Sequence, residues 1–134
     1  MKRIILKKCL FFTALLSAYL TINAEEFMIG DIMFKTNDDN QTVTLLYAYD
    51  ISGAVSIPES VEYKGVEYRV TIIGEQAFVE HEEITEVSIP NTVTTIGNAA
   101  FCDCVALQSI SIPNSVTSIG DMAFHGCKKR PASI

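Results

Sequence analysis

The sequence predicts a mainly β solenoid, a protein in which short coils of chain stack on one another. Residues 88–104 and 111–127 agree at 11 of 17 positions. The shared residues recur at a constant spacing of 23, so that Ile96 corresponds to Ile119. Periods of about 20 to 29 residues that contain short strands are typical of solenoids. About two and a half such coils fit the chain, with a β-hairpin cap ahead of them.

The first residues predict a secretory signal peptide over residues 1–24. Four basic residues lie ahead of an apolar run over positions 9–20, and Ala24 ends the polar stretch that follows. The run is shorter than the roughly 20 apolar residues of a membrane-spanning helix. We expect cleavage after Ala24, export to the cell surface or the medium, and no membrane insertion afterwards. An uncleaved anchor is the alternative.

Residues 25–70 predict a β-rich N-terminal cap. Short runs of alternating polar and apolar residues are separated by turn residues, with one tight turn expected at Gly30. A hairpin that turns at Lys64 is expected between Ile57 and Ile73, because the distance along the chain between these two isoleucines is more than twice that between their equivalents in the repeats. The open end of a solenoid exposes apolar side chains and strand edges, so this segment is expected to cover it.

Residues 71–134 predict the repeats. Apolar and polar residues alternate as in a strand with one buried face, so that Ile110 points inward while Ser109 and Ser111 point outward. Four outward residues of two adjacent coils form the candidate binding surface, with an ordinary solvated sheet face as the alternative: Glu86, Ser88, Ser109 and Ser111. The final residues, 128–134, depart from the repeat and are expected to fray, as in a truncated copy of a longer array.

Residues one period apart are expected to form columns through a right-handed spiral. One column would be an aromatic spine of Phe78, Phe101 and Phe124, and another would consist of Gly74, Gly97 and Gly120. Each buried ring contributes roughly 1.5 to 3 kcal/mol of transfer free energy. The glycines require either a positive φ or the close approach of another segment, which a residue without Cβ tolerates cheaply. The hydroxyl columns Thr94/Thr117 and Thr95/Ser118 are either contact surface or solvated ladders.

The repeated pattern I-P-N-x-V-T-x-I-G-x-x-A-F-x-x-C-x-x-L-x-x-I-x-I-P, which covers Val70 to Cys127, resembles the BspA-type leucine-rich repeat family. The resemblance implies a leucine-rich-repeat solenoid in a secreted or surface protein of a host-associated bacterium or protist. It also implies a role in protein binding or adhesion, with a host or cell-surface protein as partner. The alternative is a truncated structural remnant of a longer array with no binding function of its own.

The charge of residues 25–134 disfavours two classes of partner. Sixteen acidic residues stand against six basic ones, which gives a net charge of −10. Nucleic-acid binding draws most of its affinity from Lys and Arg, and an anionic membrane repels an acidic surface. We therefore expect neither nucleic acid nor membrane as a partner.

No constellation of residues predicts catalysis, a cofactor or a metal site, so we expect a non-enzymatic protein. The acidic run over residues 80–86 has no accompanying nucleophile and is typical of a solvated face. His81 falls in one column with Cys104 and Cys127, which predicts a core position filled by a different residue, and the spacing of a zinc site is absent. Adjacent coils would bring Cys104 and Cys127 within reach of a disulfide, but buried thiols are the preferred interpretation, because sulfur packs well in an apolar column.

Overall fold

The computed structural model describes residues 24–128, in which it contains strands and no helix. The signal peptide predicted over residues 1–24 lies outside the described residues except for Ala24, as does the segment 128–134 except for Lys128. Ten strands follow one another along the described chain: β1 (Glu26–Ile29), β2 (Ile32–Thr36), β3 (Thr42–Ala48), β4 (Gly53–Ser56), β5 (Ser60–Tyr63), β6 (Val66–Ile73), β7 (Ile84–Ser88), β8 (Thr95–Ile96), β9 (Ser109–Ser111) and β10 (Ser118–Ile119). Nothing in this part of the chain forms a helix that is long and apolar enough to span a membrane. The predicted mainly β class is confirmed.

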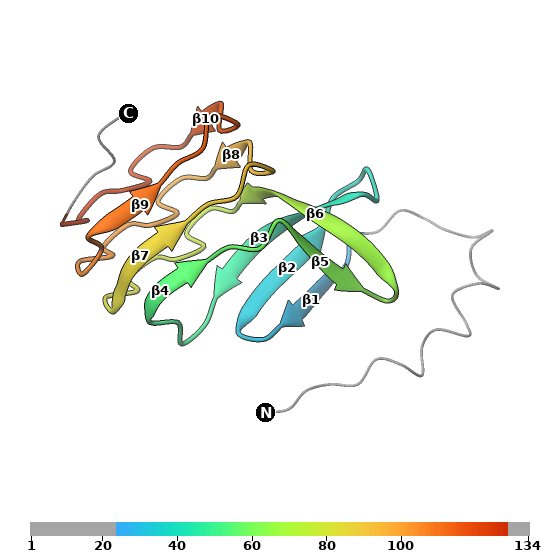
Figure 1. Cartoon of the computed structure of the whole chain (residues 1–134), viewed down its shortest axis with the longest axis horizontal. Coiled ribbons are helices and arrows are strands. Elements are labelled where there is room, and N and C mark those ends of the chain that lie inside the picture. The colour runs from blue at the N-terminus through green and yellow to red at the C-terminus, as the bar shows by residue number, and fades with distance from the viewer. Residues whose placement is uncertain (1–23, 129–134) are drawn as a thin grey trace.

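The strands form two sheets on two sides of one core (Figure 1). The large sheet has seven strands in the order β1-β2-β3-β6-β8-β10, with β5 paired to β6 outside this path. The small sheet has three strands in the order β4-β7-β9. From β6 onward the chain alternates between the two sheets, so the backbone winds once around the core in each coil.

Parallel pairing places equivalent residues of successive coils side by side. In the large sheet Ile96 pairs with Ile73 on one side and with Ile119 on the other. In the small sheet Val87 pairs with Ile110. The two members of each pair lie one period apart in the sequence, so the period corresponds to one coil of the solenoid.

The first coil of the stack begins ahead of the repeats that the sequence reveals. Strand β3 pairs in parallel with β6, where Leu45 lies beside Ile73, and β4 pairs in parallel with β7. Residues 42–57 therefore make one turn of the spiral within the segment predicted as a cap, and we call them the first coil. The predicted boundary between cap and repeats, at residue 70, lies inside β6.

Two antiparallel hairpins complete the large sheet at its N-terminal end. The β1–β2 hairpin turns at Gly30, and the β5–β6 hairpin turns at Lys64 and Gly65. All three turn residues have a positive φ, at 58°, 51° and 77° respectively. Glycine adopts such angles without the steric cost that a Cβ brings. Both turns lie where the sequence predicts them.

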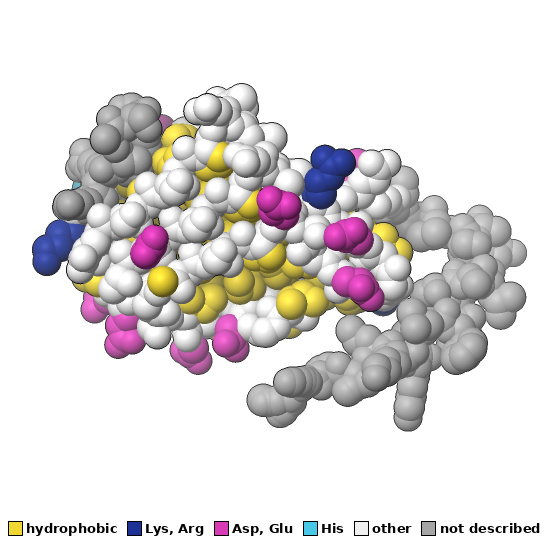
Figure 2. Space-filling model, viewed as in Figure 1, with side chains coloured by type: hydrophobic (Ala, Val, Ile, Leu, Met, Phe, Trp, Pro, Cys, Tyr) yellow, Lys and Arg dark blue, Asp and Glu magenta, His cyan; other side chains and the backbone are white. Residues whose placement is uncertain are grey.

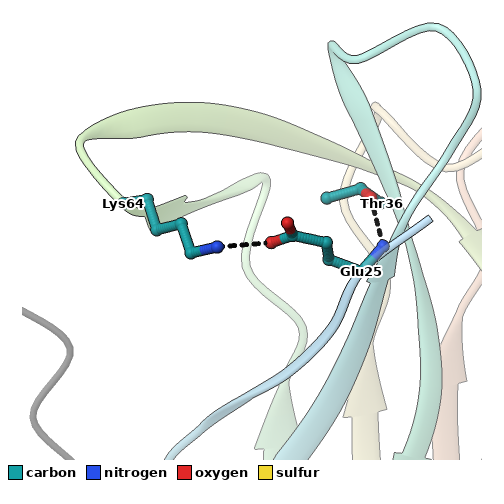
Figure 3. Close-up of polar contacts among 3 residues, drawn as sticks. All are labelled: Glu25, Thr36 and Lys64. Atoms are coloured by element: carbon teal, nitrogen blue, oxygen red, sulfur yellow. Dashed lines mark hydrogen bonds and ion pairs between the residues drawn. The ribbon is translucent and has the colours of Figure 1, made fainter. Parts of the chain in front are cut away.

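Phe27 and Glu25 of the first hairpin contact the second hairpin, and a hydrogen bond to Thr36 of β2 holds Glu25 in place; Figure 3 shows the contacts of Glu25. Phe27 of β1 stacks on Tyr63 of β5 with ring centroids 3.9 Å apart. Lys64 Nζ donates to Glu25 Oε2 over 2.8 Å, and the Glu25 backbone N–H donates to Thr36 Oγ1 over the same distance. The hydrogen bond to Glu25 raises the pKa of Lys64 above its usual value. This end of the molecule therefore depends on individual contacts and not on repetition.

An aromatic spine runs through the core. Phe78 and Phe101 stack with centroids 5.0 Å apart, and Phe101 and Phe124 stack at 5.4 Å. The stacked rings are almost parallel, with interplanar angles of 6° and 3°. Phe78 and Phe101 are fully buried, and Phe124 keeps 7% of its surface exposed.

The glycine column marks close approach between coils. A Cβ on Gly97 would lie 2.6 Å from the Glu75 backbone nitrogen, and one on Gly74 would lie 2.8 Å from the Leu45 carbonyl oxygen. Of the two explanations that the sequence leaves open, close approach applies here. Positive φ occurs instead two residues later in each coil, at Gln76, Ala99 and Met122.

Candidate binding surface

The four residues predicted to bind a partner lie on one exposed face of the small sheet. Glu86 of β7 pairs with Ser109 of β9, and Ser88 pairs with Ser111. All four side chains are exposed. They form two rows that run across neighbouring strands, with about 4.8 Å between members of a row.

The first coil extends both rows by residues that the sequence analysis missed. Ala54 of β4 pairs with Glu86, and Ser56 pairs with Ser88; both are exposed. The signal that could have located them is the likeness of A-V-S-I-P at 54–58 to E-V-S-I-P at 86–90. The offset between these two strings is longer than the period of the later repeats, because the β5–β6 hairpin is inserted between the two coils.

The small-sheet face, which we define as these six residues, carries one carboxylate among five small side chains. Figure 2 shows the front of the molecule over β4, β7 and β9 as largely uncharged, with an acidic side chain over β7. Pockets for small molecules are concave and enclose most of their ligand, whereas protein interfaces are broad and mixed in polarity. The face is therefore suited to contact with a protein.

A second group of hydroxyls is used within the stack. Thr94 Oγ1 donates to the Thr71 carbonyl oxygen over 3.3 Å, and Thr117 Oγ1 donates to the Thr94 carbonyl oxygen over 3.4 Å. Thr95 and Ser118 pair in β8 and β10 of the large sheet. These bonds link one coil to the next, which favours the ladder interpretation for the Thr94/Thr117 column.

The column of His81, Cys104 and Cys127 runs beside the spine. Cys104 Sγ donates to the Phe78 carbonyl oxygen over 3.1 Å, and Cys127 Sγ donates to the Phe101 carbonyl oxygen over 3.0 Å. Hydrogen bonding with the neighbouring Cys127 thiol, followed by burial, raises the pKa of the Cys104 thiol. A buried thiol of raised pKa is a poor nucleophile, so Cys104 has a structural role. His81, predicted to fill a core position of the same column, is only half-buried. No disulfide joins the three cysteines of residues 24–128.

Two further observations concern ligand chemistry in the described part of the chain. No three His, Cys, Asp or Glu side chains among residues 24–128 form a group that could hold a metal ion. A cleft of about 640 Å³ lies beside the loop 37–42, where Thr42 Oγ1 donates to Asp39 and accepts from Asn37 Nδ2, both over 2.8 Å. Hydrogen bonds from the Gln41 backbone and the Thr42 hydroxyl lower the pKa of Asp39. These groups satisfy one another and leave little for a ligand to bind.

Comparisons with known proteins identify the repeat. The model of the BspA type leucine rich repeat region (6 copies) matches residues 71–133. A leucine-rich repeat protein from Bacteroides capillosus is 30% identical and superposes with a TM-score of 0.57, over 77% of this chain and 92% of its own. The chain belongs to the BspA-type leucine-rich repeat family. The predicted leucine-rich-repeat fold is thereby confirmed.

Two longer structures of the leucine-rich repeat class are also similar. A leucine-rich cell surface protein from Faecalibacterium prausnitzii is 32% identical with a TM-score of 0.67, and a leucine-rich repeat protein from Bacteroides ovatus is 31% identical with a TM-score of 0.65. The matches cover 78% and 75% of this chain but only 28% and 33% of those proteins, so this chain spans about a third of their length. No curated protein matches the sequence.

Proposed function

We propose that this chain is a secreted or cell-surface, non-enzymatic module that binds another protein in adhesion, with the small-sheet face as its contact surface. The observation that carries the proposal is the alignment of six outward side chains across three parallel strands. In a solenoid the inward columns are constrained by packing, whereas outward residues are free to suit a partner. The F. prausnitzii protein, described as a cell surface protein, supports the location.

Sequence features support secretion and the kind of partner. The basic start, the apolar run over 9–20 and Ala24 match a signal peptide that is removed on export. The acidic balance of residues 25–134 disfavours nucleic acid and anionic membranes as partners. Similarity to the BspA-type leucine-rich repeat family is what implies a host or cell-surface protein as the partner.

Retention on immobilised extracellular-matrix proteins, and on bacterial and host cells, tests the proposal. Residues 25–134 should be retained by at least one of these partners. Glu86→Lys and Ser109→Trp should each weaken retention, because one reverses the only charge of the face and the other places a large ring on a flat contact. Glu62→Lys is the matched control, since Glu62 is also exposed but lies on β5.

The outcomes separate the competing functions. Retention that both face variants leave unchanged would place the contact elsewhere on the molecule. A folded chain that no partner retains would favour the alternative, a structural element of a longer array.

A further inference from the structure

A cleft opens where the first coil meets the second. It has a volume of about 510 Å³ and lies between the turn 49–52, which leads into β4, and the segment 79–83, which leads into β7. Two backbone hydrogen bonds of 2.9 Å fix its ends: the Ala48 N–H donates to the Ala77 carbonyl, and the Gly53 N–H donates to the Glu83 carbonyl. None of the residues that line the cleft belongs to the small-sheet face.

The cleft exists because the first coil is short. Leu45 pairs with Ile73 of β6, and Gly53 pairs with Ile84 of β7. Gly53 follows Leu45 by eight positions, whereas Ile84 follows Ile73 by eleven. A segment with three fewer residues cannot follow the same path between the two sheets. The shortened turn therefore separates from the turn of the next coil.

The hydrogen bonds show the same separation. In later coils they continue through the turn, as from the Phe78 N–H to the Ala100 carbonyl over 2.7 Å. Within the described chain no backbone hydrogen bond joins residues 49–52 to residues 78–82. The Ala48 N–H donates to the residue before Phe78, just as the Phe78 N–H donates to the residue before Phe101. Ala48 therefore occupies, in the first coil, the position that a phenylalanine holds in the later coils.

Three aromatic rings line the cleft. The rings of Tyr47 and Tyr49 meet edge to face with centroids 4.9 Å apart, and those of Tyr47 and His81 meet in the same way at 6.0 Å. Tyr49 keeps 41% of its surface exposed, and the other two rings are half-buried. The face of an accessible aromatic ring attracts cations through its quadrupole.

Carboxylates surround the rings without a balancing charge. Asp50, Glu80, Glu82 and Glu83 line the cleft and are exposed. The ion pair Lys64–Glu25 is the only one within residues 24–128 and involves none of them. Figure 2 shows acidic side chains in a row along the lower edge of the molecule, over the turns that lead into β4 and β7. Both the rings and the charges favour a cation.

The chemistry of the lining selects among cations. A metal ion needs three or more converging ligands, and no such group occurs in the described part of the chain. A guanidinium group is planar, stacks on aromatic faces and forms two parallel hydrogen bonds with one carboxylate. The volume lies within the range of pockets that enclose ligands, roughly 300 to 1,000 Å³, so an arginine side chain fits with part of its own backbone.

We propose that this cleft binds an arginine side chain of a partner protein, with the guanidinium against the rings of Tyr47 and Tyr49 and within reach of the rim carboxylates. The partner class rests on the protein-binding role proposed above. The cleft is nevertheless separate from the small-sheet face, so the two can be tested apart.

NMR titration of residues 25–134 with a short glycine peptide that carries two arginines tests the inference. Chemical-shift changes should concentrate at residues 47–52 and 79–83. The peptide in which citrulline replaces arginine has nearly the same shape but no charge, and it should bind about tenfold more weakly or worse, since it loses the charge-assisted hydrogen bonds. Equal binding of the two peptides, or shifts spread over other surfaces, would overturn the inference.

Variants divide the contributions of ring and charge. Tyr49→Ala should weaken the arginine peptide about two- to fivefold, and Tyr49→Phe should not, because the ring face is kept. Glu82→Gln with Glu83→Gln should weaken it by a similar factor, whereas Glu62→Gln on β5 removes a charge at a distance and should have little effect. If Glu62→Gln lowered the affinity for the arginine peptide as much as the cleft variants do, the attraction would be a general effect of charge, and the proposed site would be refuted.

The result also separates this inference from the proposed function. Retention on matrix proteins or cells without binding of the arginine peptide would refute the cleft and leave the protein-binding role in place. Binding of the peptide in the cleft, with retention that Glu86→Lys and Ser109→Trp do not change, would confirm the cleft and move the contact away from the small-sheet face.

Discussion

The first coil and the later coils wind in the same way around different interiors. In the later coils the spine rings stack at 5.0 and 5.4 Å, and backbone hydrogen bonds continue through the turns. In the first coil Ala48 takes the position of the phenylalanine, and the turn 49–52 separates from the turn beneath it. Repetition of the sequence therefore fills the core, whereas departure from the repeat opens a cleft. A binding site in such a fold is best sought where one coil differs from the next.

The largest expected effect comes from the spine. Phe101→Ala should lower the free energy of unfolding by about 3 to 5 kcal/mol, because the ring is fully buried between two others. Phe78→Ala should cost less, since the ring beside it on the first-coil side is missing and the side chain of Ala48 stands there. Urea unfolding followed by far-UV circular dichroism measures both. A Phe101→Ala protein that unfolds cooperatively at nearly the same urea concentration as the parent would contradict the role of the spine.

One glycine of the later coils and one of the first coil are required for different physical reasons. Gly97 of the later coils has no room for a Cβ, so Gly97→Ala should cost about 1 to 3 kcal/mol and Gly97→Asn should cost more. Gly53 of the first coil has open space around it but a φ of 73°. There Ala should cost about 1 to 2 kcal/mol, and Asn, which tolerates this conformation better, should cost less. The ranking of Ala and Asn should thus reverse between the two positions, and thermal unfolding of the four variants tests it; the same ranking at both would show that one cause applies to both glycines.

The repeated columns could be predicted from the sequence because the same physical demand recurs once in every coil. Each spine phenylalanine, each glycine of the glycine column and the isoleucine before that glycine recurs once per coil, so the spacing places each of them beside its equivalent in the next coil. The hairpin that turns at Lys64 could also be predicted, because a Lys-Gly pair suits a tight turn and both residues adopt the positive φ that such turns need.

The first coil and its cleft could not be predicted in this way. Strand β3 carries Val43-Thr44 followed by two leucines, and β6 carries Val70-Thr71 followed by two isoleucines, but the offset between them is not the period. The pairing register also shifts between Val43 and Thr44, so Leu45 and not Leu46 lies beside Ile73. Tyr47 and Tyr49 belong to the first coil, which lacks the period of the later coils, so the sequence does not place them beside His81 of the cysteine column. The acidic run over residues 80–86 could be identified from the sequence, but the sequence did not show that Tyr47, Tyr49 and Asp50 line the same cleft.

The cysteines should differ in reactivity according to their burial. Cys102 is half-buried and Cys104 is fully buried, and the pKa of each thiol is raised, at Cys102 mainly by burial. Iodoacetamide at pH 8 should therefore modify native Cys102 slowly and Cys104 more slowly still, as mass spectrometry of tryptic peptides would measure. After denaturation without reductant, all three cysteines of residues 25–134 should react. A single reactive cysteine at that stage would reveal a disulfide between Cys104 and Cys127 and a tighter link between later coils.

The smallest effect is expected at the hairpin end, where single contacts replace repetition. The Lys64–Glu25 pair is partly exposed, with 26% and 49% of the two side chains accessible, so Lys64→Met should cost only about 0.2 to 1 kcal/mol at low salt. The hydrogen bond from Lys64 to Glu25 raises the pKa of Lys64 when the chain folds, so the contribution is complete below the unfolded pKa and is lost as pH rises through the folded one. The difference in unfolding free energy between parent and variant should accordingly persist at pH 8 and shrink above pH about 10.5, the ordinary pKa of lysine. Lys35→Met is the control, since Lys35 forms no ion pair within the described residues, and a difference that stays constant across this pH range would show that Lys64 acts through its packing on Tyr63 instead.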